Sequence, residues 1–445
     1  MKLIETLKNI WKIEDLRKRL VTTFLFILIY RFGCHVVLPG INPSDLEAMR
    51  NFTNSGLMQL LDMFSGGAFG QASIFALGIM PYITASIVIQ LMGMVVPSFQ
   101  KMQREGESGR MKLNQYTRYL TVFILLFQAP AYLANLQYQV NAAGGHAHLT
   151  LPMMIFLSIV LTAGAMLIMW LGEKITDKGI GNGISIIILV GILARFPGAF
   201  VQEFTSRLNT AQGGLVMFLV EIVILFAVTA GAVMLTQGTR KVPVQYAKRI
   251  VGNKQYGGAR QYIPLKVNAA NVMPIIFAQA LMFIPITLAG FGARQDAAGL
   301  GGWISRNFGD MNGVWYNVIY FLMIVAFTYF YTAITVRPTQ MAEEMKKNSG
   351  FIPGIKPGKK TAEYLDSIMS RITLPGSIFL GIVAILPAFA RFFGVNQQFA
   401  QFFGGTSLLI TVGVVLDTLQ QIETHLMMHH YDGLMKSGKL KGRNR

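Results

Sequence analysis

The sequence is poor in charge, and negative charge is especially scarce. Charged residues make up 13% of its 445 residues, against roughly a quarter in soluble globular proteins, while 53% are hydrophobic. The hydrophobic residues come in blocks of about 20, enough to cross a bilayer as an α-helix. Strands of a membrane β-barrel instead alternate apolar and polar residues over about ten positions. The composition therefore predicts an all-α polytopic membrane protein.

Paired cysteines and the short motifs of catalysis are also missing. Cys34 is the single cysteine, so no intramolecular disulfide can form. No HExxH zinc-protease motif occurs. The stretch "GIKPGKKT" at 354–361 does not have P-loop spacing, because three residues rather than four separate its glycines. We therefore expect no catalytic residue, no metal site and no cofactor.

The N-terminus lacks the pattern of a signal peptide. Glu5, Glu14 and Asp15 interrupt the region where a basic stretch and an apolar stretch would be needed. Apolar residues within 1–20 instead recur at helical spacing. We predict an amphipathic cytoplasmic helix over 1–20 that lies on the membrane surface.

Ten hydrophobic blocks predict ten transmembrane helices in two halves of five. The blocks are roughly 21–38, 72–96, 116–136, 150–171, 181–200, 213–236, 269–290, 313–336, 372–390 and 402–421. The halves part near 205–212, and glycine-broken segments recur in both of them, as in membrane transport proteins built from repeats. The expected division is a first half at 21–205, a second half at 206–421 and a cytoplasmic tail at 422–445.

Positive charge predicts the orientation of the chain. All but seven of the 39 lysines and arginines fall in the two terminal segments and in alternate loops, which places both termini in the cytoplasm. Two of these loops, 236–268 and 337–371, are longer than a helix connection needs. Their basic composition favours a docking surface for a large acidic partner such as RNA or an acidic protein face. Plain solvated loops are the alternative.

Charge within the predicted spans is limited to a few residues. Arg31, Glu221 and Asp417 lie within spans or at their edges, and such residues indicate function by default. A proton- or ion-coupled carrier needs a cluster of them near the midplane, which the spacing does not indicate. A small-molecule or ion transporter with inverted repeats stays as the alternative function, and a membrane-embedded enzyme is a third.

Two isoleucine pairs stand at the start of glycine-rich spans. Ile79 and Ile83 are four residues apart, as are Ile184 and Ile188, so each pair shares a helix face. Spacing alone is typical of packing or of lipid contact. The stretch before the first pair, "FSGGAFGQASIFALGIMPYI" at 64–83, is unusual for a membrane anchor because it opens with glycines and polar residues.

Five long motifs, in order along the chain, resemble the SecY family of bacterial protein-conducting channel subunits. They are "FSGGAFGQASIFALGIMPYITASIVIQL" at 64–91, "GEKITDKGIGNGISIII" at 172–188, "PLKVNAANVMPIIFA" at 264–278, "FIPGIKPGKKTAEYLD" at 351–366 and "GTSLLI" at 405–410. The resemblance extends over the full length. It implies two pseudosymmetric five-helix halves around an hourglass pore, through which unfolded secretory polypeptides cross and from which hydrophobic segments leave sideways into the cytoplasmic membrane.

The resemblance also implies roles for particular residues. The pore ring falls on Ile79, Ile83, Ile184, Ile188, Ile276 and Ile410. A plug over 57–70 falls on Leu57, Leu60, Leu61, Phe64, Ser65, Gly66, Gly67 and Phe69, as a short helix with a Gly66–Gly67 hinge that joins the second span after Gly70. A re-entrant loop that only packs is the alternative for this segment. A lateral gate falls on Thr84, Gln128 and Asn268, with ordinary helix packing as the alternative.

The same resemblance implies partners. These are the membrane subunits SecE and SecG, the SecA motor ATPase, signal-sequence-bearing polypeptides, the lipid bilayer and the translating ribosome, whose rRNA would contact the cytoplasmic loops. The implied docking residues are Lys248, Arg249, Lys254 and Lys356. The "PGIxPG" position commonly carries Arg in the family. Lys356 keeps the charge there but loses the two-pronged hydrogen bonding of a guanidinium.

Overall fold

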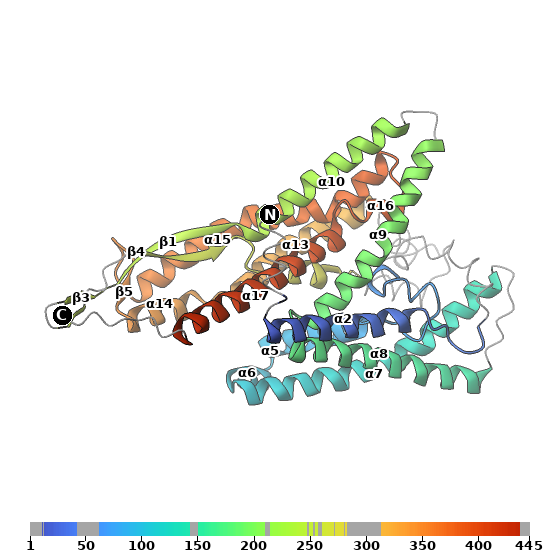
Figure 1. Cartoon of the computed structure of the whole chain (residues 1–445), viewed down its shortest axis with the longest axis horizontal. Helices are drawn as coiled ribbons and strands as arrows, with labels where there is room; N and C mark the ends of the chain where they lie inside the picture. The colour runs from blue at the N-terminus through green and yellow to red at the C-terminus, as the bar shows by residue number, and fades with distance from the viewer. Residues whose placement is uncertain are drawn as a thin grey trace. The chain divides into compact units, whose positions relative to one another are not determined.

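Long helices dominate the computed structural model of the chain (Figure 1). Contacts between backbone positions divide it into two compact units, residues 1–200 with 414–445, and residues 201–413. The sequence placed the division near 205–212. The described residues are 11, 13–41, 62–142, 150–209, 214–246, 249–251, 254–256, 260–270, 272–279, 281–282 and 313–436. Most of the predicted N-terminal helix and part of the C-terminal tail lie outside them.

The described regular elements of unit 1 (residues 1–200 and 414–445) are helices, apart from an isolated β-bridge between Val37 and Ser73. Its elements are α2 (Glu14–Cys34), α5 (Met80–Val95), α6 (Pro97–Arg104), α7 (Glu107–Ala142), α8 (Leu151–Lys178), most of α9 (Gly183–Asn209) and the end of α17 (Gly405–Lys436). Helix α8 packs against α2 and α7, and α7 also packs against α5. Leu125, Leu133, Leu157 and Leu161 form the centre of the apolar core between α7 and α8.

The second predicted span begins later than its hydrophobic block. The block starts at residue 72, but residues 74–79 form turns and α5 begins only at Met80. Ala72 and Gly78 have positive φ angles of 45° and 57°, which an α-helix does not allow. Pro81 then occupies the first turn of α5, where its missing N–H costs nothing. The helical part of the span is therefore about a third shorter than predicted.

Unit 2 (residues 201–413) combines long helices with two small sheets. Its described elements are the end of α9, α10 (Gly214–Gln237), β1 (Thr239–Tyr246), β2 (Arg249–Val251), β3 (Lys254–Tyr256), β4 (Arg260–Lys266), α13 (Val314–Thr335), α14 (Pro338–Lys347), β5 (Gly350–Phe351), α15 (Lys359–Phe392), α16 (Gln397–Ala400) and the start of α17. Helix α15 packs against α13 and α14. Residues 273–279, inside the predicted 269–290 span, are also helical.

Both long basic loops contribute to one sheet. Its strand order is β4-β1-β5, with β1 and β4 from the 236–268 loop and β5 from the 337–371 loop. Strand β1 is antiparallel to β4 and β5, and Val242 stands opposite Ile263. Val242, Val244 and Leu265 pack on Met345 and Leu365 from the second loop. The two loops therefore form a folded body with its own apolar core.

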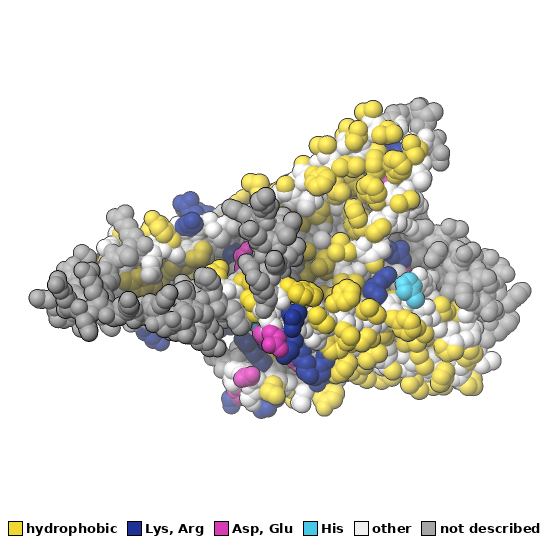
Figure 2. Space-filling view, in the orientation of Figure 1, with side chains coloured by type: hydrophobic (Ala, Val, Ile, Leu, Met, Phe, Trp, Pro, Cys, Tyr) yellow, Lys and Arg dark blue, Asp and Glu magenta, His cyan; other side chains and the backbone are white. Residues whose placement is uncertain are grey.

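Seven described helices are long and apolar enough to cross a membrane, or eight if the broken pair α5–α6 counts as one span. The seven are α7, α8, α9, α10, α13 with α14, α15 and α17. Along α10, hydrophobic side chains gather on the surface, as lipid contact requires (Figure 2). The predicted polytopic helical membrane fold is confirmed.

Helix α9 runs past residue 200, the predicted end of the fifth span, and carries Arg195 and Arg207. Arg207 lies in a buried ionic cluster in unit 2. Its Nε is 2.9 Å from Glu203 Oε1 and its Nη2 is 2.6 Å from Glu221 Oε1. The side chains of Glu203, Glu221 and Arg207 are 1%, 4% and 13% exposed. Of these three residues, the sequence had singled out only Glu221.

This cluster also fixes the turn after α15. Arg207 donates to the carbonyl of Gly394 at 3.0 Å, and Glu203 Oε2 accepts from the amide of Asn396 at 2.9 Å. The cluster therefore joins α9, α10 and the 393–396 turn. Asp417, the remaining charge that the sequence singled out with Arg31 and Glu221, is exposed on α17.

Candidate functional site

The segment at 62–70 is a buried, tightly turned piece of backbone in unit 1. Only residues 62–64 are helical, and turns follow. The Gly67 amide donates to the Asp62 carbonyl at 2.8 Å, and Gly66 and Gly67 have positive φ angles of 66° and 93°. Glycine adopts this left-handed backbone without steric cost. Of the predicted short helix over 57–70, the described part is therefore helical at 62–64 and continues as a series of tight turns to Gly70.

Two polar side chains of the 62–70 segment stabilise its turns through hydrogen bonds to its own backbone. Ser65 Oγ donates to the Asp62 carbonyl at 3.1 Å and accepts from the Phe69 amide at 3.0 Å. Asp62 Oδ1 accepts from the Gly70 amide at 2.7 Å. Asp62 and Ser65 are both buried. Backbone amides that the turns leave unpaired thus find partners within the segment, as buried polar groups require.

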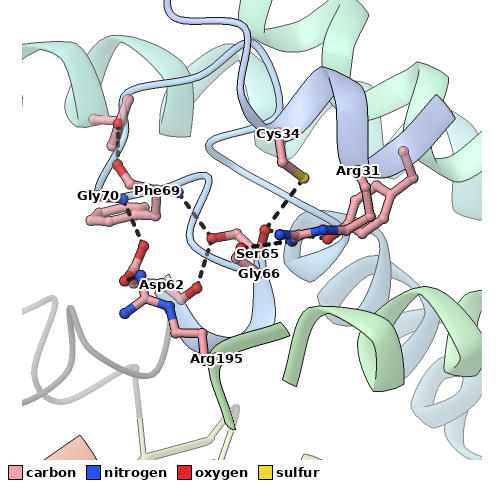
Figure 3. A network of polar contacts seen from close by, with 10 residues as sticks. Arg31, Cys34, Asp62, Ser65, Gly66, Phe69, Gly70 and Arg195 are labelled. Atoms are coloured by element: carbon pink, nitrogen blue, oxygen red, sulfur yellow. Dashed lines mark hydrogen bonds and ion pairs between the residues drawn. The ribbon is translucent and has the colours of Figure 1, made fainter. Parts of the chain in front are cut away.

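Neighbouring helices reach the segment through hydrogen bonds to its carbonyls (Figure 3). On α2, the Tyr30 hydroxyl donates to Ser65 O at 3.2 Å, and Arg31 Nη1 donates to Gly66 O at 3.0 Å. From α7, the Tyr132 hydroxyl donates to Phe69 O at 2.8 Å. Arg31, which the sequence placed within the first span, is thus engaged with this segment.

An ion pair adds a contact from α9. Asp62 Oδ2 pairs with Arg195 Nη2, and the two side chains lie together in Figure 3. The Asp62 side chain is 3% exposed and that of Arg195 is 29% exposed. The pair therefore has one buried partner and one partly exposed partner.

The isoleucines assigned to the pore ring lie in both units. In unit 1, Ile79 and Ile188 are buried, and Ile83 and Ile184 are half-buried. Ile79 is the N-cap of α5 and accepts the first helical hydrogen bond, from the Ile83 amide at 3.1 Å. Asn182 Oδ1 accepts from the Ile184 amide at 3.1 Å and so starts α9. In unit 2, Ile276 is half-buried and Ile410 is buried.

The gate and docking residues are also distributed over both units. Thr84 and Gln128 are half-buried in unit 1, and the Thr84 hydroxyl donates within its own helix, to Met80 O at 3.1 Å. Asn268 is buried in unit 2. Arg249 lies on strand β2 and Lys254 on strand β3. The two strands form an antiparallel pair. The predicted residues Leu57, Leu60, Leu61 and Lys248 lie outside the described residues.

Lys356 lies at an exposed turn beside the β4-β1-β5 sheet. Gly354 and Gly358 flank it with positive φ angles of 84° and 105°. The Thr361 hydroxyl donates to the Lys356 carbonyl at 3.0 Å and fixes the turn against the start of α15. Lys359 and Lys360 are exposed there as well. The turn thus presents a group of lysines to solvent.

Comparison with known proteins decides the family. The family model described as SecY matches residues 73–419. The chain belongs to the SecY family. Two SecY relatives, each a protein translocase subunit, are 43% identical to it. The relative from Streptomyces scabiei aligns over 96% of this chain and 98% of its own, and the relative from Halalkalibacterium halodurans over 98% and 100%.

Solved structures share the fold. A protein-conducting channel has a TM-score of 0.62, with 19% identity and 92% of each chain covered. A second structure, of a SecY protein whose plug domain stabilises the closed state of the translocation channel and maintains a membrane seal, has a TM-score of 0.60 with the same identity and coverage. Sec61 in the canine ribosome–channel complex has a TM-score of 0.58, again with 19% identity and 92% coverage.

Family membership establishes the general activity. The chain is a multi-pass membrane protein and a protein-conducting channel of the SecY type. SecY is a family of translocation-channel subunits and not a known enzyme family. The small-molecule transporter and the membrane enzyme that the sequence left open are not supported. The resemblance on five motifs is confirmed.

Proposed function

We propose that the chain passes unfolded secretory polypeptides across the bacterial cytoplasmic membrane and releases hydrophobic segments sideways into it. Both termini are cytoplasmic in this proposal, in keeping with the distribution of lysine and arginine. The observation that carries the proposal is the buried 62–70 segment, which lies against α9, the helix of Ile184 and Ile188. A plug that closes the resting channel has to lie next to the narrowest part of the pore. The 62–70 segment contacts α9, which carries two of the isoleucines assigned to that part.

The plug in this proposal spans residues 57–70, of which 62–70 are described. Its backbone is irregular, which a membrane protein tolerates only where protein or a water-filled cavity surrounds it. Its polar contacts to α2 and α7 are individual hydrogen bonds to its carbonyls, and Phe69 also packs against Tyr132 of α7. Each such hydrogen bond contributes roughly 1 kcal/mol, so each can be broken at a modest cost.

The six isoleucines form the waist of the pore in the same proposal. A narrow apolar ring resists wetting and so holds back water and ions. Ile79 and Ile83 would line it from α5, Ile184 and Ile188 from α9, and Ile276 and Ile410 from unit 2. Isoleucine carries no charge that would trap a passing chain.

Cysteine crosslinking tests the ring. In a chain whose Cys34 is replaced by Ser, a cysteine introduced at Ile79 or Ile276 is expected to crosslink to a secretory polypeptide stalled in transit. Leu219→Cys is the matched control, because Leu219 is exposed on the apolar surface of α10. Crosslinks from position 219 without any from 79 and 276 would overturn the ring assignment.

Lateral release is assigned to Thr84, Gln128 and Asn268. Interhelical hydrogen bonds in membranes contribute on the order of 1 kcal/mol each. A gate made of such bonds stays closed at rest and yields to a hydrophobic segment. Thr84 already bonds within its own helix, so its hydroxyl would act at the gate as an acceptor.

Energy for transport comes from partners in this proposal, since we assign the chain no catalytic activity and no cofactor. SecE and SecG join it in the membrane, and SecA or a translating ribosome drives it. The β4-β1-β5 sheet and the exposed lysines around 356–360 are the proposed docking surface. Their positive charge suits rRNA or an acidic protein face. The ribosome-bound Sec61 relative shares the fold.

Charge reversal at the docking turn tests this surface. Lys356→Glu is expected to reduce SecA-driven or ribosome-coupled transport about tenfold, because it adds repulsion where attraction steers binding. The amount of channel in the membrane is expected to stay unchanged, since Lys356 is exposed. Lys178→Glu, at the exposed end of α8, is the control. Equal loss of transport in both variants would contradict a docking role for Lys356.

A further inference from the structure

We propose that Asp62 and Arg195 form an ionic latch that holds the 62–70 segment in the resting channel, with Gly191 of α9 as its seat. The inference rests on the proposed role of this segment as a plug. It adds a charged contact and a helix face that the implied plug and ring residues do not include.

Helix α9 carries the ring residues and the latch on one face. Ile184, Ile188, Gly191 and Arg195 follow each other at intervals of four, three and four residues, which places them in one stripe along an α-helix. Arg195 lies seven residues beyond Ile188, or about 10 Å along the helix axis. The same stripe can therefore supply the apolar ring, a surface for the plug and a charge that holds it.

At Gly191, the backbone of α9 lies in direct contact with the backbone of the 62–70 segment. A Cβ atom added at Gly191 would lie 3.1 Å from the Phe64 carbonyl oxygen and 3.2 Å from the Gly66 amide nitrogen. A Cβ atom added at Gly66 would in turn lie 3.0 Å from the Gly191 Cα. Side chains larger than hydrogen would separate the segment from the helix, so two glycines allow the segment to lie directly on α9.

Asp62 is the only charged residue between positions 62 and 79. One carboxylate oxygen shapes the segment, through the Gly70 amide, and the other pairs with Arg195. Without the arginine, a carboxylate that is 3% exposed would be left buried without its ion-pair partner. The ion pair thus attaches the segment at the same residue that shapes its turn.

The uneven burial of the pair makes the latch reversible. The attraction between two charges falls about fourfold when the effective dielectric constant rises from about 20 near a protein surface to about 80 in water. Arg195 is already partly uncovered, being 29% exposed. When a translocating polypeptide begins to displace the segment, water enters around the ion pair and weakens the attraction between Asp62 and Arg195. The rest of the displacement then requires less energy.

Ion conductance of the resting channel tests the latch, measured in planar bilayers on the full-length chain with its membrane partner subunits. Asp62→Asn keeps an oxygen for the Gly70 amide and removes the charge. We expect this variant and Arg195→Gln each to raise resting conductance about tenfold, with Arg195→Lys close to the parent chain. The double variant is expected to match the single variants, because both remove one interaction. Asp417→Asn, at an exposed carboxylate of unit 1, is the control.

Deletion of residues 62–70 separates the latch from the plug. If the deletion raises conductance but Asp62→Asn and Arg195→Gln do not, or if their effects add in the double variant, the latch is overturned and the plug stands. If the deletion leaves conductance unchanged while the chain still transports a secretory precursor, the plug itself is wrong. Variant levels in the membrane, and transport of the same precursor, show that each variant has folded.

Discussion

Replacing Arg207 by methionine is expected to destabilise the folded channel by about 3–5 kcal/mol. The substitution leaves Glu203 and Glu221 buried, at 1% and 4% side-chain exposure, without the guanidinium that lies between them. It also removes the hydrogen bond that ties the Gly394 carbonyl to α9. Thermal or denaturant unfolding of the detergent-solubilised channel measures the loss.

Two further variants make this prediction specific. Arg371→Met removes an exposed arginine of α15 and is expected to change stability by less than about 0.5 kcal/mol. The triple variant with Glu203→Gln, Arg207→Met and Glu221→Gln removes every charge of the cluster and is expected to recover most of the loss, since no charge then stays buried alone. An Arg207→Met chain as stable as the parent would show that the cluster does not hold α9, α10 and the 393–396 turn together.

Replacing Gly191 by leucine is expected to unseat the 62–70 segment and to raise the resting ion conductance about as much as deletion of that segment. The atoms that the new side chain would meet, the Phe64 carbonyl and the Gly66 amide, belong to the backbone and cannot rotate away. Overpacking of this kind costs about 1–3 kcal/mol, and each 1.4 kcal/mol corresponds to a factor of about ten in plug occupancy. Bilayer recordings of the purified channel measure the effect.

Gly198→Leu is the matched control for this substitution. Gly198 lies on the same helix, and a Cβ atom added there would meet nothing within 4 Å. Both variants gain helix propensity by a similar amount, so a difference in conductance between them reports the fit at position 191. Equal conductance in the two variants and the parent chain would rule out Gly191 as the seat.

Regular features of the fold could be predicted because they depend on local pattern. Long hydrophobic runs predicted helices such as α8 and α10, and the five motifs predicted the family. Irregular backbone could not be predicted in the same way. The 72–96 block is hydrophobic enough on average to predict a span, but its first residues form turns in which Ala72 and Gly78 adopt positive φ angles. Hydrophobicity carries no signal for that conformation.

Contacts between distant residues were missed for a different reason. Asp62 and Arg195 are separated by most of unit 1, so no spacing in the sequence links them. Glu203 and Arg207 do have the i,i+4 spacing of a helical ion pair. That signal was available, but it was overlooked because the fifth hydrophobic block ends near residue 200. Helix α9 continues through Pro197 to Asn209, and the pair forms on that extension.

The β4-β1-β5 sheet has a mechanical consequence. Strand β1 follows α10 after Gly238 alone, and the turn at 353–358 connects β5 to α15 within a few residues. The apolar core of the sheet includes Leu365 and Met369 of α15 itself. A load applied at this sheet therefore reaches two membrane helices without passing through a slack linker. In the proposed function, a partner bound to this sheet would therefore act directly on α10 and α15.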